Sequence, residues 1–230
     1  MINAVILAAG MGSRMNYGYN KQFIKINNKE ILAYTLEAFN KCEDIDNIVI
    51  VASKNEVEYI KENIVTKYNI DKVKSITVGG DTRQESVYNG LKKIGDPSIV
   101  VIHDGARPFI NKNIIKESIN KARQFGASTT GVKVKDTIKK GENNIFTETV
   151  DRTCIYSIQT PQSFKRDIIL ECHEKAREEG FEATDDSMIV EKYGYRVSIV
   201  EGDYFNIKIT TREDIFIGEG IIKALGRKYD

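Results

Sequence analysis

Hydrophobic residues in this chain alternate between short continuous runs and longer stretches with helical spacing. The runs at residues 4–7, 47–52 and 98–102 are rich in valine and isoleucine, as expected for strands buried on both faces. In residues 30–41, apolar side chains instead recur every three or four positions, which predicts an amphipathic helix. This alternation predicts an α/β fold with a parallel sheet covered by helices on both faces.

The same pattern extends through most of the chain. Asparagine, glycine and proline between the periodic segments mark turns, as at residues 27–29. Further strands are predicted at residues 74–78, 155–159 and 196–200. A helix follows the second strand and ends near residue 67, and further helices are predicted at residues 83–94, 111–124 and 164–179. Two more helices begin at residues 183 and 211.

Residues 128–149 depart from this alternation. Side chains alternate over residues 128–140, a turn follows at 141–144, and alternation resumes over 145–149, which predicts a β-hairpin. A lone hairpin that is polar on both sides of its tip is marginally stable. It is therefore either a solvated surface arm or an arm that packs on a second copy of the chain. We expect one domain over residues 1–230, with residues 133–155 as an inserted arm.

The first strand runs into a glycine-bearing loop with its own cations. Gly10 and Gly12 lack the Cβ that would keep backbone amides away from phosphate oxygens. Arg14 adds a planar donor fork and Lys21 a mobile charge. The loop lacks the third glycine of the dinucleotide fingerprint and the Gly-Lys-Ser/Thr of the P-loop. A plain tight turn is the alternative, but the cations favour a triphosphate ligand.

A second glycine loop, Val-Gly-Gly-Asp-Thr-Arg, follows the third strand and opens a helix. Arg83 and Ser86 fall in the first turn of that helix, where backbone N–H groups can meet an anion. The alternative is an ordinary capped helix with a solvated Arg83. Two such loops at one edge of a sheet favour a phosphate site over either loop alone.

The fourth strand ends in His-Asp-Gly-Ala-Arg-Pro, which supplies both a carboxylate and a cation. Ligands of open parallel sheets bind beyond the carboxyl ends of strands, so Asp104 can hold a magnesium ion against phosphate oxygens. Arg107 can hold a second anion. His103 is interpreted as a packing or supporting residue rather than a general base, because phosphoryl-type transfer depends on positioning and charge.

Composition narrows the class of protein. The chain has 230 residues, of which 41% are hydrophobic and 29% charged, with a net charge of +1. This balance gives no reason to expect a nucleic acid or membrane partner, and we expect a cytoplasmic protein. Cys42, Cys154 and Cys172 are too few and too widely spaced for a disulfide framework or a zinc site, and are expected to be reduced thiols in packing positions.

The loop residues together indicate a reaction class. Five cations and one carboxylate follow the predicted strands and glycine loops, which suits a phosphate-rich ligand and a divalent metal: Arg14, Lys21, Arg83, Arg107 and Lys208, with Asp104. No Ser-His-Asp or Cys-His set offers a covalent nucleophile. The second substrate must then bring its own nucleophile, and a phosphate oxygen needs no general base at neutral pH. Nucleotidyl transfer with departure of pyrophosphate follows.

The motifs also carry a resemblance over nearly the whole chain. The collinear segments, from residue 4 to 214, are LAAGMGSRM, NKQF, GGDTRQESVYNGL, HDGARPF, VKDTIK, VDR, IQTPQSF, ATDDS and VEGDYFNIKITTREDI. In these the chain resembles the 2-C-methyl-D-erythritol 4-phosphate cytidylyltransferases of the non-mevalonate isoprenoid pathway. The resemblance implies a Rossmann-like, mostly parallel sheet of the nucleotide-diphospho-sugar transferase type, a β-arm that interlocks two subunits as a homodimer, and magnesium.

The resemblance also implies a role for each matching residue. CTP would be bound by Ala8, Ala9, Gly10, Gly12, Arg14, Lys21, Gly80, Asp81, Arg83, Ser86, Ala106 and Lys208, and the metal by Asp104. Arg14 and Lys21 would carry charge in the transition state. The polyol phosphate would be held by Arg107, Thr160 and Thr184, with Thr137 and Arg152 from the partner's arm.

One departure and two alternatives stay open at this point. The family often has alanine where this chain has Gly105, which we expect to loosen the backbone beside Asp104. Ribitol 5-phosphate cytidylyltransferases share the glycine loop and the Gln-Thr-Pro-Gln stretch, although the segments around Thr137 and Arg152 resemble the methylerythritol group more closely. A non-catalytic nucleotide sensor is the other alternative, and it would not need Arg14, Lys21 and Asp104 together.

Overall fold

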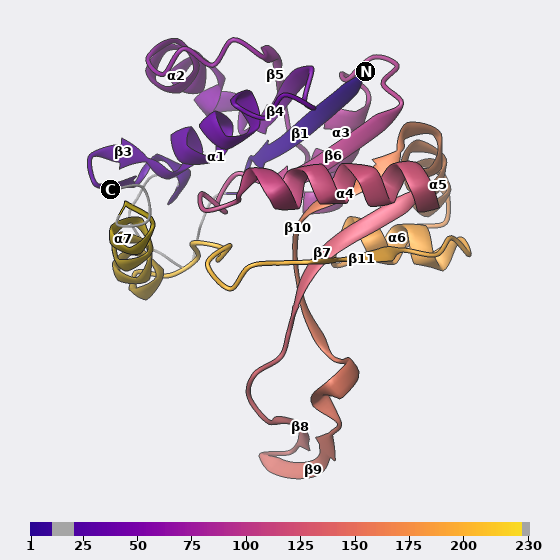
Figure 1. Ribbon diagram of the computed structural model, residues 1–230. Coiled ribbons are helices and arrows are strands. Elements are labelled where there is room, and N and C mark those ends of the chain that lie inside the picture. The colour runs from indigo at the N-terminus through magenta and orange to yellow at the C-terminus, as the bar shows by residue number, and fades with distance from the viewer. Residues whose placement is uncertain (11–20, 227–230) are drawn as a thin grey trace.

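The computed structural model describes residues 1–10 and 21–226 and has a mixed β-sheet between layers of helices (Figure 1). The strands of the main sheet are β1 (Ile2–Ala8), β4 (Asn47–Ala52), β5 (Val73–Val78), β6 (Ile99–Asp104), β7 (Ala127–Lys133), β10 (Tyr156–Lys165) and β11 (Ser198–Glu201). The helices are α1 (Ile31–Asn40), α2 (Val57–Ile60), α3 (Arg83–Leu91), α4 (Lys112–Phe125), α5 (Arg166–Glu178), α6 (Asp186–Lys192) and α7 (Glu213–Gly226).

The sheet has seven strands in the order β11-β7-β10-β6-β1-β4-β5. Strands β5, β4, β1 and β6 run parallel to one another, so their carboxyl ends meet at one edge. Strand β10 runs antiparallel to both β6 and β7. The predicted α/β class and mostly parallel sheet are confirmed.

Alternate residues of the central strand serve two separate cores. Ala4 and Ile6 of β1 pack in a cluster with α1 and α4, while Val5 and Leu7 pack in a cluster with α3, α5 and α6. A strand buried on both faces needs apolar residues at every position, and each residue of β1 is buried. The predicted covering by helices on both faces follows from this pattern.

Strand β10 differs from the prediction, which ended a strand at residue 159 and began a helix at 164. The strand runs to Lys165, and its pairing with β7 is irregular between Gln159 and Gln162. Pro161 lies in this bulge, where its missing N–H leaves no gap in a regular ladder. The proline therefore marks an irregularity within a strand, and α5 begins only at Arg166.

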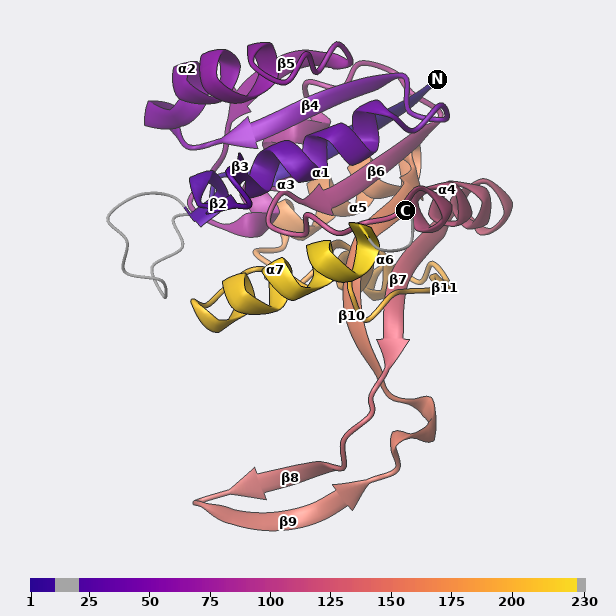
Figure 2. The same cartoon turned by 60° about the vertical axis from the view of Figure 1, so that its left-hand side comes forward.

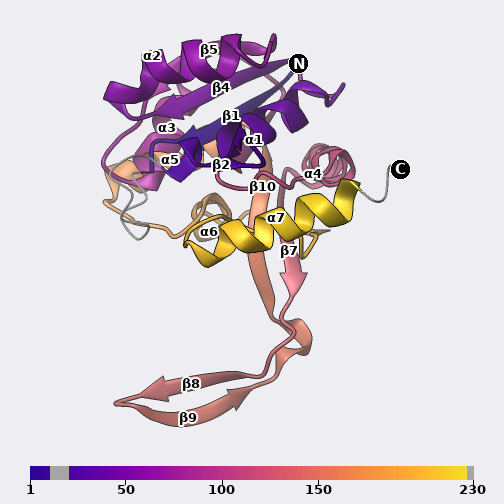
Figure 3. The same ribbon diagram turned by 90° about the vertical axis from the view of Figure 1, so that its left-hand side faces the viewer.

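The predicted hairpin is divided between two sheets. Residues 127–133 belong to the main sheet as β7, and only β8 (Ile138–Glu142) and β9 (Ile145–Val150) form the separate two-stranded sheet. Figures 2 and 3 show β8 and β9 projecting well away from the body of the molecule. The long alternating pattern thus covers one core strand and one strand of the arm, because alternation does not distinguish them.

Three smaller segments complete the description. Residues 54–66, predicted as one helix, divide into a 3₁₀ turn (Lys54–Glu56), α2 and a π-helical segment (Lys61–Thr66). The predicted turn at residues 27–28 joins β2 (Lys25–Ile26) to β3 (Lys29–Glu30), and both asparagines have positive φ. Among the described helices, none has the length and apolar character that crossing a bilayer requires.

The cysteines are free thiols, as predicted, but only two occupy packing positions. Cys42 and Cys172 are buried in the two cores. Cys154 is exposed in the short 3₁₀ turn Arg152–Cys154 that follows β9. The sequence carries no signal that distinguishes this cysteine, because its exposure depends on where the arm leaves the body.

Candidate functional site: two adjoining cavities at the carboxyl edge of the sheet

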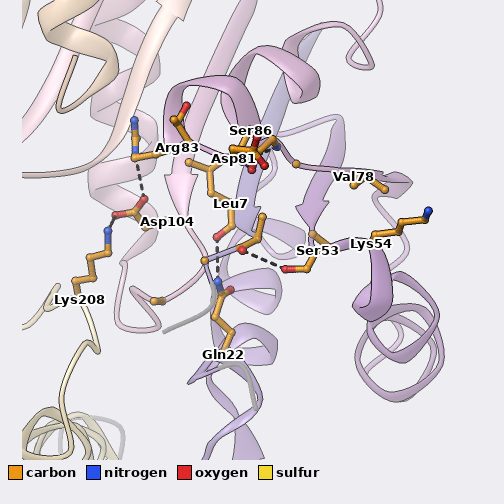
Figure 4. Close-up of a pocket in the computed structure, with 17 residues that line it drawn as sticks. Leu7, Gln22, Ser53, Lys54, Val78, Asp81, Arg83, Ser86, Asp104 and Lys208 are labelled. Atoms are coloured by element: carbon orange, nitrogen blue, oxygen red, sulfur yellow. Dashed lines mark hydrogen bonds and ion pairs between the residues drawn. The ribbon is translucent and has the colours of Figure 1, made fainter. Parts of the chain in front are cut away.

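A cavity of about 470 Å³ opens where β1, β4, β5 and β6 end (Figure 4). Every one of these strands contributes wall residues at its carboxyl end, as the parallel order requires. The wall consists of Leu7, Ala9, Gly10, Gln22, Ala52, Ser53, Lys54, Val78, Gly79, Gly80, Asp81, Thr82, Arg83, Ser86, Asp104, Ala106 and Lys208. This first cavity therefore collects both predicted loops, as far as the structure describes them.

A second cavity of about 300 Å³ adjoins the first. It is lined by Arg83, Asp104, Arg107, Ile158, Gln159, Thr160, Gln162, Thr184, Asp185 and Lys208. Arg83, Asp104 and Lys208 line both cavities, and we call these three residues the shared wall. Two ligands bound side by side would meet at the shared wall.

The second glycine loop is built to approach the first loop closely. A Cβ on Gly79 would lie 2.8 Å from the Ala9 Cβ and 2.7 Å from the Ser86 Oγ, so only glycine allows this contact. Thr82 and Glu85 form a capping box at the start of α3. The loop amides are already engaged, because Gly80 donates to Ser86 Oγ and Asp81 to the Glu85 carboxylate. Two of the backbone N–H groups of this loop thus have partners within the chain.

Asp104 is the centre of charge at the shared wall. Lys208 Nζ lies 2.8 Å from Asp104 Oδ2, Arg83 Nε 3.6 Å from Oδ1, and Arg107 Nε 3.7 Å from Oδ2. Figure 4 shows Arg83 and Lys208 approaching this carboxylate from two sides. Burial by itself would raise the pKa of Asp104, but the three cations hold it well below its usual range. Asp104 is therefore a permanent anion near neutral pH.

Helix α3 is capped, but Arg83 pairs with two carboxylates, so the alternative of a capped helix with a solvated Arg83 is wrong. Its Nη2 donates to Asp186 Oδ2 at 2.7 Å, and its Nε faces Asp104. Asp186 is fully buried at the start of α6. Burial alone would lower the pKa of Arg83, but Asp186 and Asp104 raise it well above its usual value. The guanidinium is thus held as a cation between two carboxylates.

The buried His103 side chain supports the residues around Asp104 through hydrogen bonds. It is fully buried, and burial lowers its pKa to about 4, so the ring is neutral near pH 7. Its Nε2 lies 3.2 Å from the Arg107 carbonyl oxygen, which can only accept, so Nε2 carries the proton. Nδ1 then accepts from Thr160 Oγ1 at 3.0 Å, and Thr160 Oγ1 accepts from the Asp104 amide. The predicted supporting role fits this geometry.

Gly105 does not loosen the backbone as expected. A Cβ there would lie 2.3 Å from Gln22 Oε1 and 2.9 Å from the Leu7 carbonyl oxygen. The Leu7 carbonyl accepts from the Gly105 amide at 2.9 Å and from Gln22 Nε2 at 3.4 Å. The space that alanine would fill is thus occupied by the Gln22 carboxamide, which hydrogen-bonds to the end of β1.

The two cavities bring together most of the residues predicted to bind ligands. Ala9, Gly10, Gly80, Asp81, Arg83, Ser86, Ala106 and Lys208 line the first cavity, and Arg107, Thr160 and Thr184 line the second. Ala8 does not: it ends β1 with its side chain in a core. Thr137 and Arg152 are exposed beside the arm and line neither cavity of their own chain. Gly12, Arg14 and the side chain of Lys21 lie outside the described residues.

The sequence argument missed several residues of the site. Ser53 and Lys54 line the first cavity after β4, and Gln22 lies buried beside them. The sequence argument gave Asp185 and Asp186 no place in the site, whereas Asp186 is the hydrogen-bond partner of Arg83. Two adjacent carboxylates are a visible signal, but their partner is 103 positions away along the chain.

The acidic groups limit the kind of metal that this site could hold. Among the described residues, no cluster of three or more His, Cys, Asp and Glu side chains could enclose a metal ion. Asp104 is a single anionic carboxylate that lines both cavities. Mg²⁺ is commonly bound by one or two carboxylates together with substrate phosphates and water. The residues therefore fit a magnesium ion that shares Asp104 with phosphate oxygens.

Comparison with known proteins agrees with this geometry. A family model described as 2-C-methyl-D-erythritol 4-phosphate cytidylyltransferase matches residues 2–224. The chain belongs to this family. A member so named from Clostridium novyi is 52% identical over 223 residues, covering 96% of each chain, and another from Clostridium acetobutylicum is 48% identical over 221 residues, again 96% of each.

Solved structures give the same result. The crystal structure of 4-diphosphocytidyl-2C-methyl-D-erythritol synthase from Anaerococcus prevotii is 35% identical, with a TM-score of 0.86 and 97% of this chain and 96% of that chain covered. The Thermus thermophilus cytidylyltransferase structure is 28% identical, with a TM-score of 0.78 and 95% and 98% covered. The chain is thus a nucleotidyltransferase of this family, and the resemblance seen in its motifs is confirmed. These findings favour the methylerythritol assignment over the ribitol 5-phosphate cytidylyltransferase and the nucleotide sensor.

Proposed function

We propose that this protein transfers the cytidylyl group of CTP to 2-C-methyl-D-erythritol 4-phosphate. A phosphate oxygen of the polyol phosphate attacks the α-phosphorus of CTP and forms a new P–O bond. The bond from the α-phosphorus to the oxygen that bridges it to the β-phosphorus breaks, and pyrophosphate leaves. The products are CDP-methylerythritol and pyrophosphate, a step of non-mevalonate isoprenoid biosynthesis.

One observation carries this proposal: two cavities of different chemistry adjoin at the shared wall. The first has the size of a small-molecule site and ends in glycine loops, and we assign CTP to it. The residues assigned to CTP are Ala8, Ala9, Gly10, Gly12, Gly80, Asp81, Arg83, Ser86, Ala106 and Lys208. Ala8 would act only through its backbone, because its side chain lies in the core.

We assign the polyol phosphate to the second cavity. Arg107 offers a guanidinium whose Nη1 is anchored on the Asn206 carbonyl oxygen at 2.8 Å, and Thr160 and Thr184 offer hydroxyl groups. The phosphate would then lie next to the shared wall, within reach of an α-phosphate in the first cavity. This proximity is the main contribution that a two-substrate site can make to the rate.

The chemistry needs charge rather than proton transfer. Arg14 and Lys21 are proposed to stabilise the negative charge that develops as pyrophosphate departs. Asp104 would hold a Mg²⁺ ion that arrives with the triphosphate, and such an ion supplies partial neutralisation of the phosphates when bound. His103 does not act as a base, because it is fully buried and both ring nitrogens are engaged.

The arm completes the proposal. Thr137 and Arg152 would reach the second cavity of a partner subunit in a homodimer, since they line neither of the two cavities described above in their own chain. Ile145 and Phe146 on β9 are 69% and 76% exposed, as expected for residues that another surface covers. We place the dimer in the cytoplasm, without nucleic acid or membrane partners.

Pyrophosphate release tests the proposed reaction. The chain, CTP and magnesium are combined either with methylerythritol 4-phosphate or with ribitol 5-phosphate, and release is followed for both. We expect strong preference for methylerythritol 4-phosphate. Preference for ribitol 5-phosphate would contradict the substrate assignment, and no release with either would leave a nucleotide-binding protein without this activity.

A Lys21→Ala variant tests the charge argument. Turnover should fall by roughly 1,000-fold, because the ammonium acts mainly in the transition state, while CTP affinity measured by calorimetry falls much less. Equal losses in turnover and affinity would contradict a transition-state role for Lys21. Lys25→Ala is the matched control, since Lys25 is exposed and pairs with Glu30 outside both cavities.

A further inference from the structure

Asp186 is a fully buried carboxylate outside the set of residues assigned to substrates. It is the first residue of α6, and its backbone N–H donates to Gln162 Oε1 at 3.0 Å. Its Oδ1 lies 3.2 Å from His173 Nε2 on α5, and its Oδ2 accepts from Arg83 on α3 at 2.7 Å. Two helices, α3 and α5, therefore hold the side chain of Asp186, and Gln162 of β10 holds its backbone.

Arg83 is held at a defined distance from Asp104 by this contact. Its planar fork directs Nη2 to Asp186 and Nε toward Asp104, which is 3.6 Å away. Nη1 has no hydrogen bond or ion pair with any residue that the structure describes. The guanidinium thus keeps one donor group for a ligand at the shared wall, and Asp186 decides which way that group points.

Asp186 also directly follows two residues that line the second cavity. Thr184 and Asp185, the two residues before it, line that cavity. The Asp185 side chain caps α6 by accepting from the Met188 amide at 2.8 Å, and it also accepts from Gln162 Nε2 at 2.8 Å. A movement of Asp186 would therefore move Arg83 on the nucleotide side and the 184–185 loop on the polyol side together.

We propose that Asp186 is a positioning residue: it fixes Arg83 at the shared wall and thereby sets how the two substrate cavities lie relative to each other. The proposal rests on the function assigned above. His173 and Gln162 support Asp186; His173 lines neither cavity, whereas Gln162 also lines the second cavity. Asp186 itself lines neither cavity, and its effect on catalysis passes through Arg83.

A double-mutant cycle tests this role. Asp186→Asn keeps the shape of the side chain and removes its charge, and Arg83→Gln removes the partner charge. If Asp186 acts through Arg83, Asp186→Asn lowers kcat/KM by roughly 30-fold in the native chain but by less than about threefold in the Arg83→Gln background. Similar factors in both backgrounds would overturn the proposal, because a purely structural residue does not depend on Arg83.

Thermal unfolding of the same variants separates positioning from folding. Asp186→Asn leaves Arg83 with only Asp104 as a partner, and Arg83→Gln leaves the buried Asp186 carboxylate without its cation, so each single variant should unfold at a lower temperature. Arg83→Gln/Asp186→Asn leaves a neutral pair and should recover part of the loss. Activity should not recover with it. Recovery of both together would show that Asp186 acts only on stability and would contradict the positioning role.

A control variant and a measurement of CTP affinity complete the test. Asp167→Asn is the matched control, because Asp167 is an acidic residue in the first turn of α5 but is 91% exposed, and it should leave kcat/KM unchanged. CTP affinity is measured by calorimetry for all four chains of the cycle. If native protein releases no pyrophosphate, the proposed function fails, and the coupling is then judged from CTP affinity, since Arg83 lines the first cavity.

Discussion

At the shared wall, the Asp104 side chain is 10% exposed, and Asp186, the partner of Arg83 behind it, is fully buried. On the arm, by contrast, Ile145 and Phe146 are 69% and 76% exposed. The charges of the wall are held by residues from β6, α3, α6 and the segment around Lys208. Strands β8 and β9 pair only with each other among the described strands. The charged groups of the body hold one another in place, whereas none of the other described strands pairs with the outer part of the arm.

This difference separates two kinds of contribution to one proposed site. Groups at the shared wall should affect both stability and catalysis, because their charges are buried and mutually paired. Groups on the arm should affect catalysis alone, and only in a dimer. The four predictions below test this division, beginning with the largest effect.

Asp104→Asn should lower kcat/KM by roughly 1,000-fold, since it removes the one anion that Arg83, Arg107 and Lys208 share. The variant should also unfold at a lower temperature. Steady-state pyrophosphate release and thermal melting check both effects. Asp44→Asn is the control, because Asp44 pairs with Lys116 on the surface at 3.6 Å and should change neither. A fully active Asp104→Asn enzyme would contradict the central place of this carboxylate.

His103 should make the stability of the body depend on pH. Its pKa in the folded chain is about 4, below the ordinary value near 6.5. Between these two pH values the His103 ring is therefore protonated in the unfolded chain but neutral in the folded chain. Stability from this group is complete above pH 6.5 and is lost as pH falls toward 4. We expect a loss of roughly 2 to 3 kcal/mol between pH 7 and 4.5.

Urea unfolding of the native chain and His103→Asn at both pH values measures this contribution. The asparagine variant should be less stable at pH 7, and its stability should decline less on acidification. Parallel declines in the two proteins would show that His103 is not the titrating group.

Arg152→Ala should raise the KM for the polyol phosphate by roughly 30-fold, the loss expected for one hydrogen bond to a charged group. Its melting temperature should stay unchanged, because Arg152 is exposed and its Nη1 donates only to the Lys135 carbonyl oxygen among the described residues. Lys140→Ala, another exposed cation of the arm, is the matched control and should leave the KM unchanged.

Mixing subunits decides whether the arm acts across the dimer. Equal amounts of Arg152→Ala and Lys21→Ala chains should regain about a quarter of native activity, since half of the dimers are mixed and each has one intact site. No recovery would place Arg152 in the site of its own subunit or outside any site.

Gly105→Ala should have the smallest effect. The new methyl group would meet Gln22 Oε1 and the Leu7 carbonyl oxygen, and we expect a loss of about 1 kcal/mol in unfolding free energy. Gly95→Ala is not a suitable comparison because Gly95 has positive φ, whereas Gly220→Ala on α7 meets no atom within 4 Å. A Gly105→Ala chain as stable as the native one would show that Gln22 moves aside freely.

The sequence by itself determined the layers of the fold and the edge of the sheet that holds the site. Apolar runs and helical spacing are local properties, so they located β1, β4, β6, α1 and α4 within a few residues. The end of a parallel strand is also a local property, which is why Asp104 and both glycine loops were placed at one edge. The family motifs are also short local segments, so the sequence alone was enough to identify the family.

Only the tertiary structure decided the partners of these residues. Arg83 and Asp186 are 103 positions apart, and the Gly105 contact with Gln22 depends on how two loops approach each other. The bulge at Pro161 and the division of the hairpin between two sheets depend on which strands pair, and side-chain alternation is the same in either sheet. Long-range pairing of charges and strands leaves no periodic trace in the sequence, because it is set by packing rather than by neighbours in the chain.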